Sequence, residues 1–444
     1  MKYLFIDNFR GFSNAAIPIR DVNFLVGENS TGKTSLLGIL RLISTPRFLL
    51  DQGFSDEHVS LGNFSDMVSI HASDRTYFHI GLAWEESGNK SNGNGAVGWL
   101  LTYIDDSGIP RLDRYTVCRN GRTLHLRFGP QSTKFKWIDH AVAPSLQDVV
   151  TALPQWALVH RSSEDKGYEN LSTPKAWGRV PLLIALSMCS QGAKATGKGE
   201  VKVKVKRSTN VDINSPEGLT FAPDLTWIAP IRTKPRPTYG ESPKDFDPEG
   251  EHTPYLIRRI LRSKTQASEF HAFMKKVGEA SGLFQDVIIK KFGREKGGPF
   301  EVDIIIDEKA LKLTTVGYGV SQSLPVLVEI LARHHGSWFA IQQPEVHLHP
   351  RAQAALGDVV FEMAKTEHKG FLIETHSDFM IDRFRMNYRN GKSSPDSQII
   401  FFERQEKHNA VTVLPISKEG NLPSDQPKSY REFFIKEQMD LLGM

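Results

Sequence analysis

The sequence predicts an α/β fold: a mostly parallel sheet built from both ends of the chain, with a mixed α+β insertion between them. The first observation is a glycine-rich loop at residues 27–34, which follows an apolar run (Val22 to Val26) and precedes a helix-like run. The second is the alternation of short apolar strands with helical segments from Phe300 onward. Such alternation is typical of parallel sheets, whose ligands bind at the carboxyl ends of the strands.

The N-terminal elements follow from apolar spacing. Tyr3 to Phe9 is predicted to be a strand, and Ile17 to Val26 contains one or two more. A helix is expected over Ser35 to Ile43, and Pro46 limits its length because proline removes a backbone donor.

The middle of the chain predicts a different layer. Three short segments rich in β-branched and aromatic residues indicate an antiparallel sheet; they are Tyr77 to Trp84, Trp99 to Ile104 and Thr123 to Phe128. Helical spacing follows over Ser145 to His160 and Val180 to Cys189.

A strictly alternating segment then places Lys202, Lys204 and Lys206 on one strand face. This face could follow the phosphate backbone of double-stranded DNA. The competing interpretation is an edge strand that lysines protect from aggregation. Both stay open, with the edge strand preferred.

The later segments return to an α/β pattern. Pro254 to Leu283 is predicted to be largely helical, and Lys290, Lys291, Arg294 and Lys296 suggest a solvated hairpin. The elements expected after it are a strand over Val302 to Ile306, a helix through Leu331, a strand over Trp338 to Ile341, a helix over Ala352 to Lys365 and a strand over Gly370 to Glu374.

Composition narrows the class of protein. The chain has 444 residues, 39% hydrophobic and 24% charged, which fits a globular protein of two or three domains. No apolar run approaches a membrane span, and the N-terminus lacks a signal peptide, so we expect a cytoplasmic location without membrane contact. Cys118 and Cys189 have neither disulfide nor metal spacing. The net charge of +4 requires a local patch for any nucleic-acid binding.

Residues 27–34 match the phosphate-binding loop: two glycines separated by four residues, then Lys and Thr. Such a loop curls backbone N–H groups around a phosphate, and the following helix N-terminus adds positive potential. Lys33 is expected to reach the β- and γ-phosphates, and the Thr34 hydroxyl to ligate Mg²⁺. The predicted ligands are therefore ATP and Mg²⁺. The candidate binding residues are Gly27, Glu28, Asn29, Ser30, Thr31, Gly32, Lys33, Thr34 and Ser35, with Arg10.

Four segments carry a resemblance to a known class. They are Pro344 to Pro350 (Pro-Glu-Val-His-Leu-His-Pro), Asn8 to Phe12, Trp227 to Arg232 and Tyr430 to Phe434. The chain resembles ATPases of the ABC class, in the branch of SMC, RecF and OLD proteins, and within it bacterial AAA-type ATPases with a Pro-Glu-x-His-Leu-His-Pro motif. The resemblance implies an ABC-type ATPase head formed by residues 1–85 and 300–444, around an insertion at 86–299.

The resemblance also implies roles. Gly317, Gly319, Ser321 and Gln322 would belong to the signature loop, which contacts the γ-phosphate held by a second subunit. A homodimer, or a higher homo-oligomer, would then close around ATP. His376 corresponds to the switch histidine that senses the γ-phosphate.

One departure concerns catalysis. Members of this class end the strand before Pro344 with carboxylates, whereas this chain has Gln342 and Gln343. An amide cannot act as a base at neutral pH. Three interpretations stay open: Glu345 is the working acid and hydrolysis is slow; the protein is an ATP-held switch with little hydrolysis; or the glutamines are an introduced, nucleotide-trapping substitution. We favour the first.

His347 and His349 next to Glu345 could suggest a metal site. We reject it because the sequence shows no third ligand. A loop that orders the dimer interface is the preferred interpretation.

The resemblance favours a regulatory ATPase of a bacterial anti-phage defence system that acts with a separate effector, a nuclease or toxin. We expect a separate effector because the chain ends at Met444, without room for a Toprim nuclease domain of about a hundred residues. The alternative is a stand-alone, RecF-like repair ATPase that binds DNA. An ABC transporter subunit is disfavoured by the form of the signature loop and the large insertion.

Overall fold

The computed structural model describes residues 1–45, 48, 53–85, 95–119, 121–129, 132–162, 166–171, 221–222, 225–240, 245–293, 298–390 and 394–434. Two predictions lie outside these residues: the helix over Val180 to Cys189 and the lysine strand with Lys202, Lys204 and Lys206. Arg294 and Lys296 of the second basic cluster also lie outside them.

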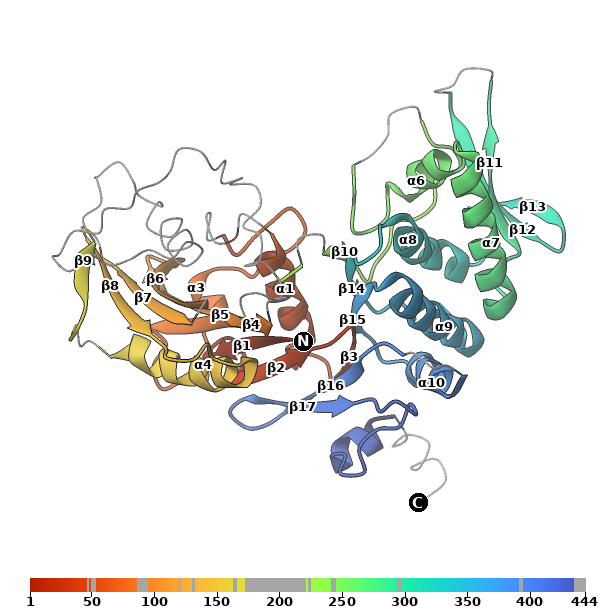
Figure 1. Cartoon of the computed structure of the whole chain (residues 1–444). Helices are drawn as coiled ribbons and strands as arrows, with labels where there is room; N and C mark the ends of the chain where they lie inside the picture. The colour runs from red at the N-terminus through yellow and green to blue at the C-terminus, as the bar shows by residue number, and fades with distance from the viewer. Residues whose placement is uncertain are drawn as a thin grey trace. The chain divides into compact units, whose positions relative to one another are not determined.

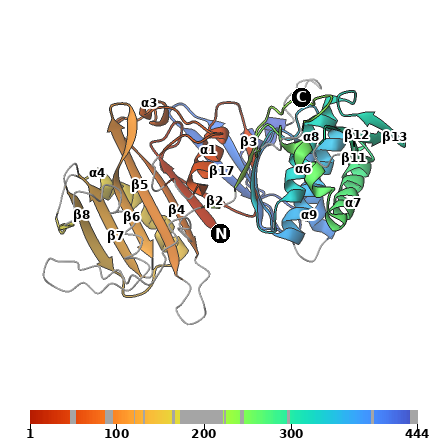
Figure 2. The same cartoon turned by 90° about the horizontal axis from the view of Figure 1, so that it is seen from above.

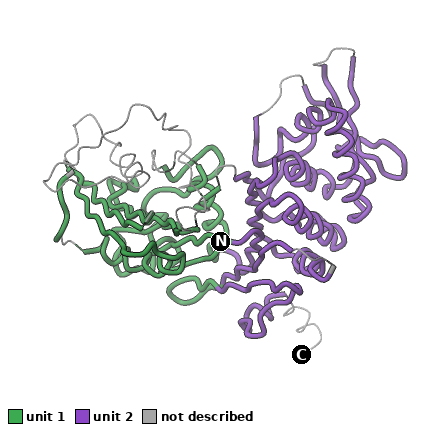
Figure 3. The backbone as a smooth tube through the Cα atoms, in the orientation of Figure 1, with its two compact units in different colours: residues 1–19, 30–223, 403–411 green, residues 20–29, 224–402, 412–444 purple. Residues whose placement is uncertain are grey.

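The chain divides into two compact units, drawn in green and purple in Figure 3. Unit 1 consists of residues 1–19, 30–223 and 403–411, and unit 2 of residues 20–29, 224–402 and 412–444. Both units therefore draw on segments from the beginning and the end of the sequence. The division into 1–85, 86–299 and 300–444 stays a prediction.

Unit 1 contains, among its described residues, an eight-stranded antiparallel sheet in the order β2-β1-β4-β5-β6-β7-β8-β9. Its strands are β1 (Lys2–Asp7), β2 (Ala15–Ile19), β4 (Tyr77–Glu85), β5 (Ala96–Asp106), β6 (Ile109–Arg119), β7 (Arg122–Phe128), β8 (Thr133–Asp139) and β9 (Glu169–Leu171). The predicted antiparallel layer is confirmed. Strands β6 and β8 were not predicted because charged residues interrupt their apolar alternation.

Three described helices belong to unit 1: α1 (Lys33–Ser44), α3 (Phe64–Met67) and α4 (Leu146–Arg161). Helix α4 covers one face of the sheet (Figures 1 and 2), where Val149 and Leu153 pack in a cluster with Leu100 of β5. It begins where predicted because Ser145 and Asp148 form a reciprocal cap. The Ser145 hydroxyl accepts a hydrogen bond from the backbone N–H of Asp148, and the Asp148 carboxylate accepts one from the backbone N–H of Ser145.

Unit 2 contains, among its described residues, a six-stranded sheet in the order β10-β14-β15-β3-β16-β17. The strands are β3 (Val22–Gly27), β10 (Thr226–Ile228), β14 (Trp338–Gln342), β15 (Gly370–Glu374), β16 (Ser397–Arg404) and β17 (Asn409–Pro415). Neighbours from β10 to β16 pair in parallel. Strand β3 lies between β15 and β16, so early and late parts of the sequence form one sheet, and the α/β fold class is confirmed.

Helices α8, α9 and α10 lie on the same side of this sheet (Figure 1). The described helices of unit 2 are α6 (Thr253–Ile260), α7 (Lys264–Ser281), α8 (Tyr318–Ala332), α9 (Pro350–Glu367) and α10 (Asp378–Met386), with a 3₁₀ turn at Asn387–Asn390. The core packs rings from sheet and helices, as where Phe24 of β3 meets Phe384 of α10 with 5.0 Å between ring centroids. Apolar burial of this kind is the main stabilising term of the sheet.

One strand was assigned to the wrong sheet. Val302 to Ile306 does form a strand, β12 (Phe300–Ile306), but it pairs with β11 (Asp286–Lys291) and β13 (Lys309–Lys312) in a separate antiparallel sheet. Neither its apolar run nor its position before a helix distinguishes the two arrangements. Glu301 on this sheet contacts Lys290 at 3.5 Å and Lys312 at 2.8 Å, so Lys290 takes part in a charge pair.

Among the helices that the structure describes, none combines the length and apolar character needed to cross a bilayer.

Candidate nucleotide site

The phosphate-binding loop begins at Gly27, a position of the sheet that accommodates only glycine. Gly27 ends β3 with φ 145°, and a Cβ atom there would lie 2.1 Å from the carbonyl oxygen of Phe402 on β16. Both the backbone conformation and the close approach exclude a side chain. The strand therefore passes into the loop at the carboxyl edge of the parallel sheet.

The second half of the loop lies in unit 1 and is also strained. Ser30 has φ 63° and Gly32 has φ 100°, and a Cβ atom at Gly32 would meet the Phe12 ring at 2.7 Å. The side-chain amide of Asn409 donates to the carbonyl oxygen of Thr31 at 2.8 Å. A loop held in this way can present its N–H groups without further ordering.

Helix α1 opens at Lys33 with features that suit an anion. Gly32 is its N-cap and supplies no side-chain oxygen, and the first turn holds no acidic residue. The N–H groups of a first turn have no partners inside the helix, and their dipoles favour negative charge. Lys33 is buried and Thr34 is exposed. These residues fit the phosphates of a nucleotide, and the Thr34 hydroxyl fits the oxygen preference of Mg²⁺.

Arg10 and Ser35 contact each other within unit 1. The Arg10 guanidinium donates from Nη1 to Ser35 Oγ at 2.7 Å and from Nη2 to the Leu61 carbonyl at 2.9 Å. Burial lowers the pKa of Arg10, and Asp66 acts against this shift. The pair fixes the first turn of α1, and direct contact of either residue with a nucleotide stays a prediction.

In unit 2, three strand ends meet at one level of the sheet. The register pairs Gln342 of β14 with Glu374 of β15, and Glu374 with Leu25 of β3. The Gln342 amide donates to Glu374 Oε2 at 3.2 Å, and the Gln343 N–H donates to the Glu374 carbonyl at 2.7 Å. Gln343 has φ 42°, a conformation that costs a non-glycine residue about 1 kcal/mol or more.

Glu345 reaches from the loop after β14 to the loop after β15. Its Oε1 accepts a hydrogen bond from the backbone N–H of His376 at 2.7 Å. Its Oε2 is buried and has no hydrogen-bond partner. One carboxylate oxygen is thus fixed by the backbone, while the other is available to a small polar molecule.

Arg232, whose charge interacts with that of Glu345, was not predicted as a site residue. It follows β10, is 3% exposed, and donates from Nη2 to the Gln342 carbonyl at 3.0 Å. Its Nε and Nη1 atoms are buried without a partner. Burial lowers the pKa of Arg232 to about 10, and the charge of Glu345 opposes that shift. The only sign of Arg232 in the sequence was that it belongs to Trp227 to Arg232, one of the four segments that resemble the ABC class.

His376 is supported by the tail of the chain. Its ring stacks on Phe433 with 6.0 Å between centroids, and Phe433 in turn contacts Phe401 and Phe434 at 6.0 and 5.0 Å. The tail segment quoted for the resemblance therefore packs against the predicted switch histidine. Ser377 caps helix α10 and also donates to Gln353 of α9 at 2.6 Å.

The predicted signature loop starts helix α8. Gly317 is the N-cap with φ −59°, and nothing lies within 4 Å of a Cβ atom built there. At Gly319, a Cβ atom would lie 2.9 Å from the His347 carbonyl oxygen. Only Gly319 is therefore required by its surroundings within this unit.

The side chains of Ser321 and Gln322 form hydrogen bonds within unit 2. Ser321 Oγ donates to the Tyr318 carbonyl at 3.0 Å, and Gln322 Nε2 donates to the Arg232 carbonyl at 3.2 Å. Gln322 thus connects the signature helix to Arg232, and through it to Gln342. Nucleotide contact by these two residues stays a prediction.

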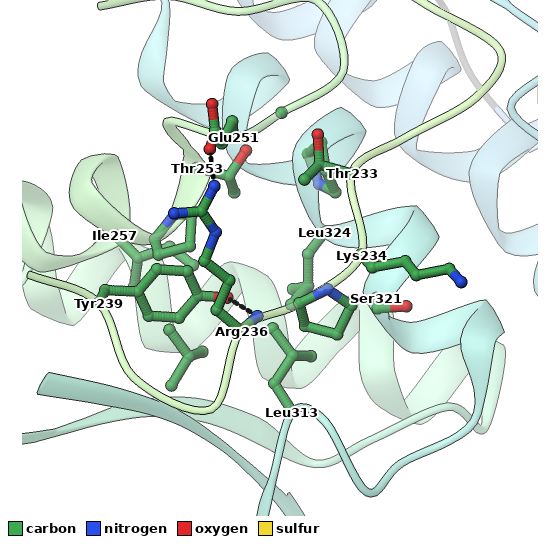
Figure 4. Close-up of a pocket in the computed structure, with 15 residues that line it drawn as sticks. Thr233, Lys234, Arg236, Tyr239, Glu251, Thr253, Ile257, Leu313, Ser321 and Leu324 are labelled. Atoms are coloured by element: carbon green, nitrogen blue, oxygen red, sulfur yellow. Dashed lines mark hydrogen bonds and ion pairs between the residues drawn. The ribbon is translucent and has the colours of Figure 1, made fainter. Parts of the chain in front are cut away.

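A small cavity lies beside α8 (Figure 4), with a volume of about 30 Å³. Ser321, Leu324, Tyr239 and Thr253 are among the residues that line it, and Arg236 forms an ion pair with Glu251 at its edge. Such a volume holds about two water molecules and is too small for a nucleotide. The buried Thr253 hydroxyl, which lacks a protein partner, suits such a water.

The two histidines of the Pro-Glu motif differ in role. His349 caps helix α9, since its side chain accepts from the Ala352 N–H at 3.4 Å. His347 has φ 66°, and its ring lies 5.7 Å from that of Tyr318 in the signature helix. Within the described ranges, no group of three or more His, Cys, Asp or Glu side chains could hold a metal ion.

Comparison with known proteins finds one family to which part of the chain is similar. Residues 1–84 and 249–381 match the family described as AAA ATPase domain. No curated protein matches the chain.

Two similar solved structures are SMC head domains. One, from Thermotoga maritima, has 10% identity and a TM-score of 0.36, and covers 94% of this chain and 98% of that chain. The other, from Pyrococcus furiosus, carries an extended coiled coil and is bound to the C-terminal domain of ScpA. It has 10% identity and a TM-score of 0.34, and covers 100% of this chain and 99% of that one.

The matched segments include the phosphate-binding loop, the signature helix and the strand ends that carry Glu345 and His376. Residues 1–84 and 249–381 of the chain are thus similar to an AAA ATPase domain.

Proposed function

We propose that this chain binds ATP with Mg²⁺ and hydrolyses it slowly, with Glu345 as the residue that orients the attacking water. The observation that carries the proposal is the geometry of Glu345. One oxygen is fixed by the His376 N–H at 2.7 Å, and the other is buried without a partner. A carboxylate held in this way can accept a hydrogen bond, and then a proton, from a water molecule.

The other parts of the site support binding. The loop N–H groups, the N-terminus of α1 and Lys33 would hold the phosphates, and Thr34 would hold Mg²⁺. When bound, Mg²⁺ neutralises charge on the phosphate oxygens. Gln342 and Gln343 can orient groups by hydrogen bonding but cannot accept a proton at neutral pH. The rate is therefore expected to be low.

The test is ATP turnover by the purified chain and by Glu345→Gln. We expect this substitution to lower turnover by roughly 10²- to 10⁴-fold, the contribution of a positioned base. ATP affinity should stay unchanged, because the substitution conserves shape and lies outside the phosphate-binding loop. Lys33→Ala serves as the control that loses binding itself. Equal turnover in Glu345→Gln and the wild type would refute the role of Glu345.

We also propose that two copies of the chain close around ATP. The support is the N-terminus of α8, where Gly317 faces open space within its own unit. A helix N-terminus without a side chain in front of it suits a phosphate from a second molecule. A homodimer is the smallest assembly that places each α8 against a second nucleotide.

The biological role that we propose is regulation of a separate effector, a nuclease or toxin, in a bacterial anti-phage system in the cytoplasm. This part rests on the resemblance of the Pro-Glu motif and its companion segments. The alternative is a stand-alone, RecF-like repair ATPase that binds DNA. Turnover measured with and without duplex DNA separates them, since a repair ATPase should respond to DNA in the absence of any partner. A defence subunit is expected to need its effector or trigger.

A further inference from the structure

We propose that Phe433 is a positioning residue for ATP hydrolysis: its ring holds His376 in the orientation in which the His376 N–H fixes Glu345. The inference rests on the proposed function, because it needs Glu345 to act on the attacking water. The residues that carry it all belong to unit 2. It gives the aromatic segment (Tyr430, Phe433 and Phe434) a part in turnover as well as in packing.

His376 takes part in two contacts, one through its backbone and one through its ring. Its N–H donates to Glu345 Oε1 at 2.7 Å. Its ring stacks on Phe433 with 6.0 Å between centroids and 29° between planes. The rotamer of a side chain depends on the backbone dihedral angles of the same residue. A ring that packs against Phe433 therefore restricts the direction in which the His376 N–H points.

The residues on either side of His376 are held by hydrogen bonds to β3 and α9. The Thr375 N–H donates to the Leu25 carbonyl at 3.2 Å, and the Ser377 hydroxyl donates to Gln353 at 2.6 Å. Thr375 and Ser377 are buried, whereas His376 between them is partly exposed. The loop after β15 therefore has fixed ends, and packing against the His376 ring can set the orientation of the residue between them.

Phe433 is itself held against the sheet. Its ring packs edge-to-face on Phe401 of β16 at 6.0 Å and on Phe434 at 5.0 Å. Tyr430 adds edge-to-face contacts with Phe401 at 5.3 Å and with Phe434 at 6.0 Å. This arrangement is a preferred geometry of aromatic pairs. Phe433 thus has a fixed position from which it can orient the His376 ring.

Phe434 offers a matched control for Phe433. The two residues are neighbours in the chain, both are partly buried, and both pack against the same core cluster. Phe434 contacts Phe433 and Tyr430, whereas Phe433 also stacks on His376. A merely structural role predicts similar effects when either ring is lost. A positioning role predicts that turnover depends on the ring of Phe433.

The experiment compares steady-state turnover of radiolabelled ATP by the full chain in four proteins: the wild type, Phe433→Leu, Phe433→Tyr and the control Phe434→Leu. Leucine keeps an apolar side chain but removes the ring, and tyrosine keeps the ring. Both kcat and KM are measured with excess Mg²⁺, because lost positioning lowers kcat whereas lost ATP binding raises KM. NMR spectra of histidine-labelled protein without nucleotide report on the His376 ring, and His376→Gln identifies its signal.

We expect Phe433→Leu to lower kcat by roughly 10- to 100-fold, since a displacement of about 1 Å can cost a reaction about 100-fold. KM should stay within about twofold of the wild type, because the substitution leaves ATP binding intact. Phe433→Tyr should keep most of the turnover, and Phe434→Leu should match the wild type. The His376 ring signals should move in Phe433→Leu, which lacks the ring current of the stacked phenyl group, and stay in place in Phe434→Leu.

Three results would overturn the inference. The first is a wild-type kcat in Phe433→Leu. The second is an equal loss of turnover in Phe434→Leu, which would indicate general packing. The third is a loss in Phe433→Tyr as large as that in Phe433→Leu, because tyrosine retains the stacking ring.

Failure of the proposed function gives a different pattern. A wild type without ATP turnover, or Glu345→Gln with wild-type turnover, would overturn the role of Glu345 and the inference with it. Lost turnover in Glu345→Gln together with full turnover in Phe433→Leu would overturn the inference alone. If thermal unfolding without nucleotide shows that Phe433→Leu does not fold, Phe433→Met decides by the same criteria, since a flexible thioether side chain fills irregular space without supplying a ring.

Discussion

At the scale of single residues, Arg232 and Glu345 of unit 2 both keep buried polar atoms without partners, and the charge of Glu345 acts on Arg232. The guanidinium keeps two buried donor atoms and the carboxylate one buried acceptor atom without partners. Such groups cost free energy unless water or a ligand supplies the missing hydrogen bonds. The arrangement is typical of a site whose last component arrives with a ligand.

We predict that Arg232→Lys lowers both stability and ATP turnover. Lysine keeps the charge but lacks the planar fork that reaches the Gln342 carbonyl, so the free energy of unfolding should fall by about 1–3 kcal/mol. Turnover should fall because the positive charge that acts on Glu345 is no longer held in a fixed position. Urea denaturation and ATP turnover measure the two effects.

The matched control for this prediction is Arg236→Lys. Arg236 is half exposed and pairs with Glu251 at the surface, where an ion pair contributes less than about 1 kcal/mol. If both substitutions change stability and turnover equally, Arg232 has no special role.

At the scale of elements, unit 1 contains a chain of buried hydrogen bonds that links its sheet to α4. His79 of β4 and His160 of α4 share the Thr102 hydroxyl at 2.9 and 2.6 Å. His160 and His125 of β7 share the Thr116 hydroxyl at 2.6 and 2.7 Å. These bonds favour one packing of helix on sheet, and His79 Nε2 is buried at the end of the chain of bonds without a hydrogen-bond partner.

Burial keeps these histidines neutral. It lowers the pKa of His79 to about 3 and that of His125 to about 4, and it lowers the pKa of His160 well below its usual value. Nearby cations add to the shift, Arg161 and Arg114 at His79 and Lys136 at His125. The unfolded chain binds protons near pH 6.5, whereas the folded chain does not.

The contribution of these neutral histidines to the free energy of unfolding is therefore predicted to be fully present above pH 6.5 and to be lost as the pH falls toward 4. His79 and His125 should each contribute a loss of about 2–3 kcal/mol by pH 4.5, since one pKa unit corresponds to about 1.4 kcal/mol, and His160 should add to the loss in the same direction. Denaturant unfolding at a series of pH values measures the slope. His125→Gln keeps a hydrogen-bonding side chain, and it should reduce the acid slope by about one proton. A slope identical to that of the wild type would contradict the assignment.

Gly317, the N-cap of helix α8, and Gly319, in its first turn, allow a second prediction at this scale. Gly319→Ala should destabilise unit 2, because its Cβ would lie 2.9 Å from the backbone oxygen of His347. Gly317→Ala should fold normally, because its Cβ meets nothing within 4 Å and its φ of −59° suits any residue. The same Gly317→Ala variant is expected to lose ATP-dependent association, and sedimentation measures this. Normal association by Gly317→Ala would remove the support for phosphate contact at this helix.

At the scale of the whole molecule, the proposed function links assembly to nucleotide. Ligand that binds only the folded dimer stabilises it by mass action, by about 2.7 kcal/mol at 100 times Kd. The mass in solution should double with MgATP, and the effect should be largest in Glu345→Gln, in which hydrolysis no longer reopens the dimer. Analytical ultracentrifugation with and without MgATP tests this. Lys33→Ala should stay monomeric, and a nucleotide-independent mass for every variant would contradict the model of ATP-driven closure.

Much of the local structure was predictable from the sequence. The strand, glycine loop and helix around residues 27–34 occur in the predicted order, because glycine spacing and apolar runs act over short distances. Helix α4 lies within one residue of its predicted range, Ser145 to His160, for the same reason, and Ser145 is its N-cap. Strand β12 was predicted as an element but placed in the wrong sheet, because strand pairing depends on distant partners.

The candidate site was predictable in part. Glu345 and His376 follow from motifs that stand next to strands, and the structure brings them together through one hydrogen bond. Arg232, Glu374 and Phe433 could not be predicted, since each acquires its place only through a partner from another part of the chain. An Arg, Glu or Phe in an ordinary segment carries no local signal of that kind.

The sequence by itself determined the α/β class, the phosphate-binding loop and the absence of the usual carboxylates at positions 342 and 343. Only the tertiary structure decided which side chains lie beside these positions. The parallel register places Glu374 beside Gln342, and the loop after β14 carries Glu345 to His376. The physical reason is that glycine loops and helix caps depend on neighbouring residues, whereas a catalytic carboxylate is defined by burial and hydrogen bonds from strands far apart in the chain.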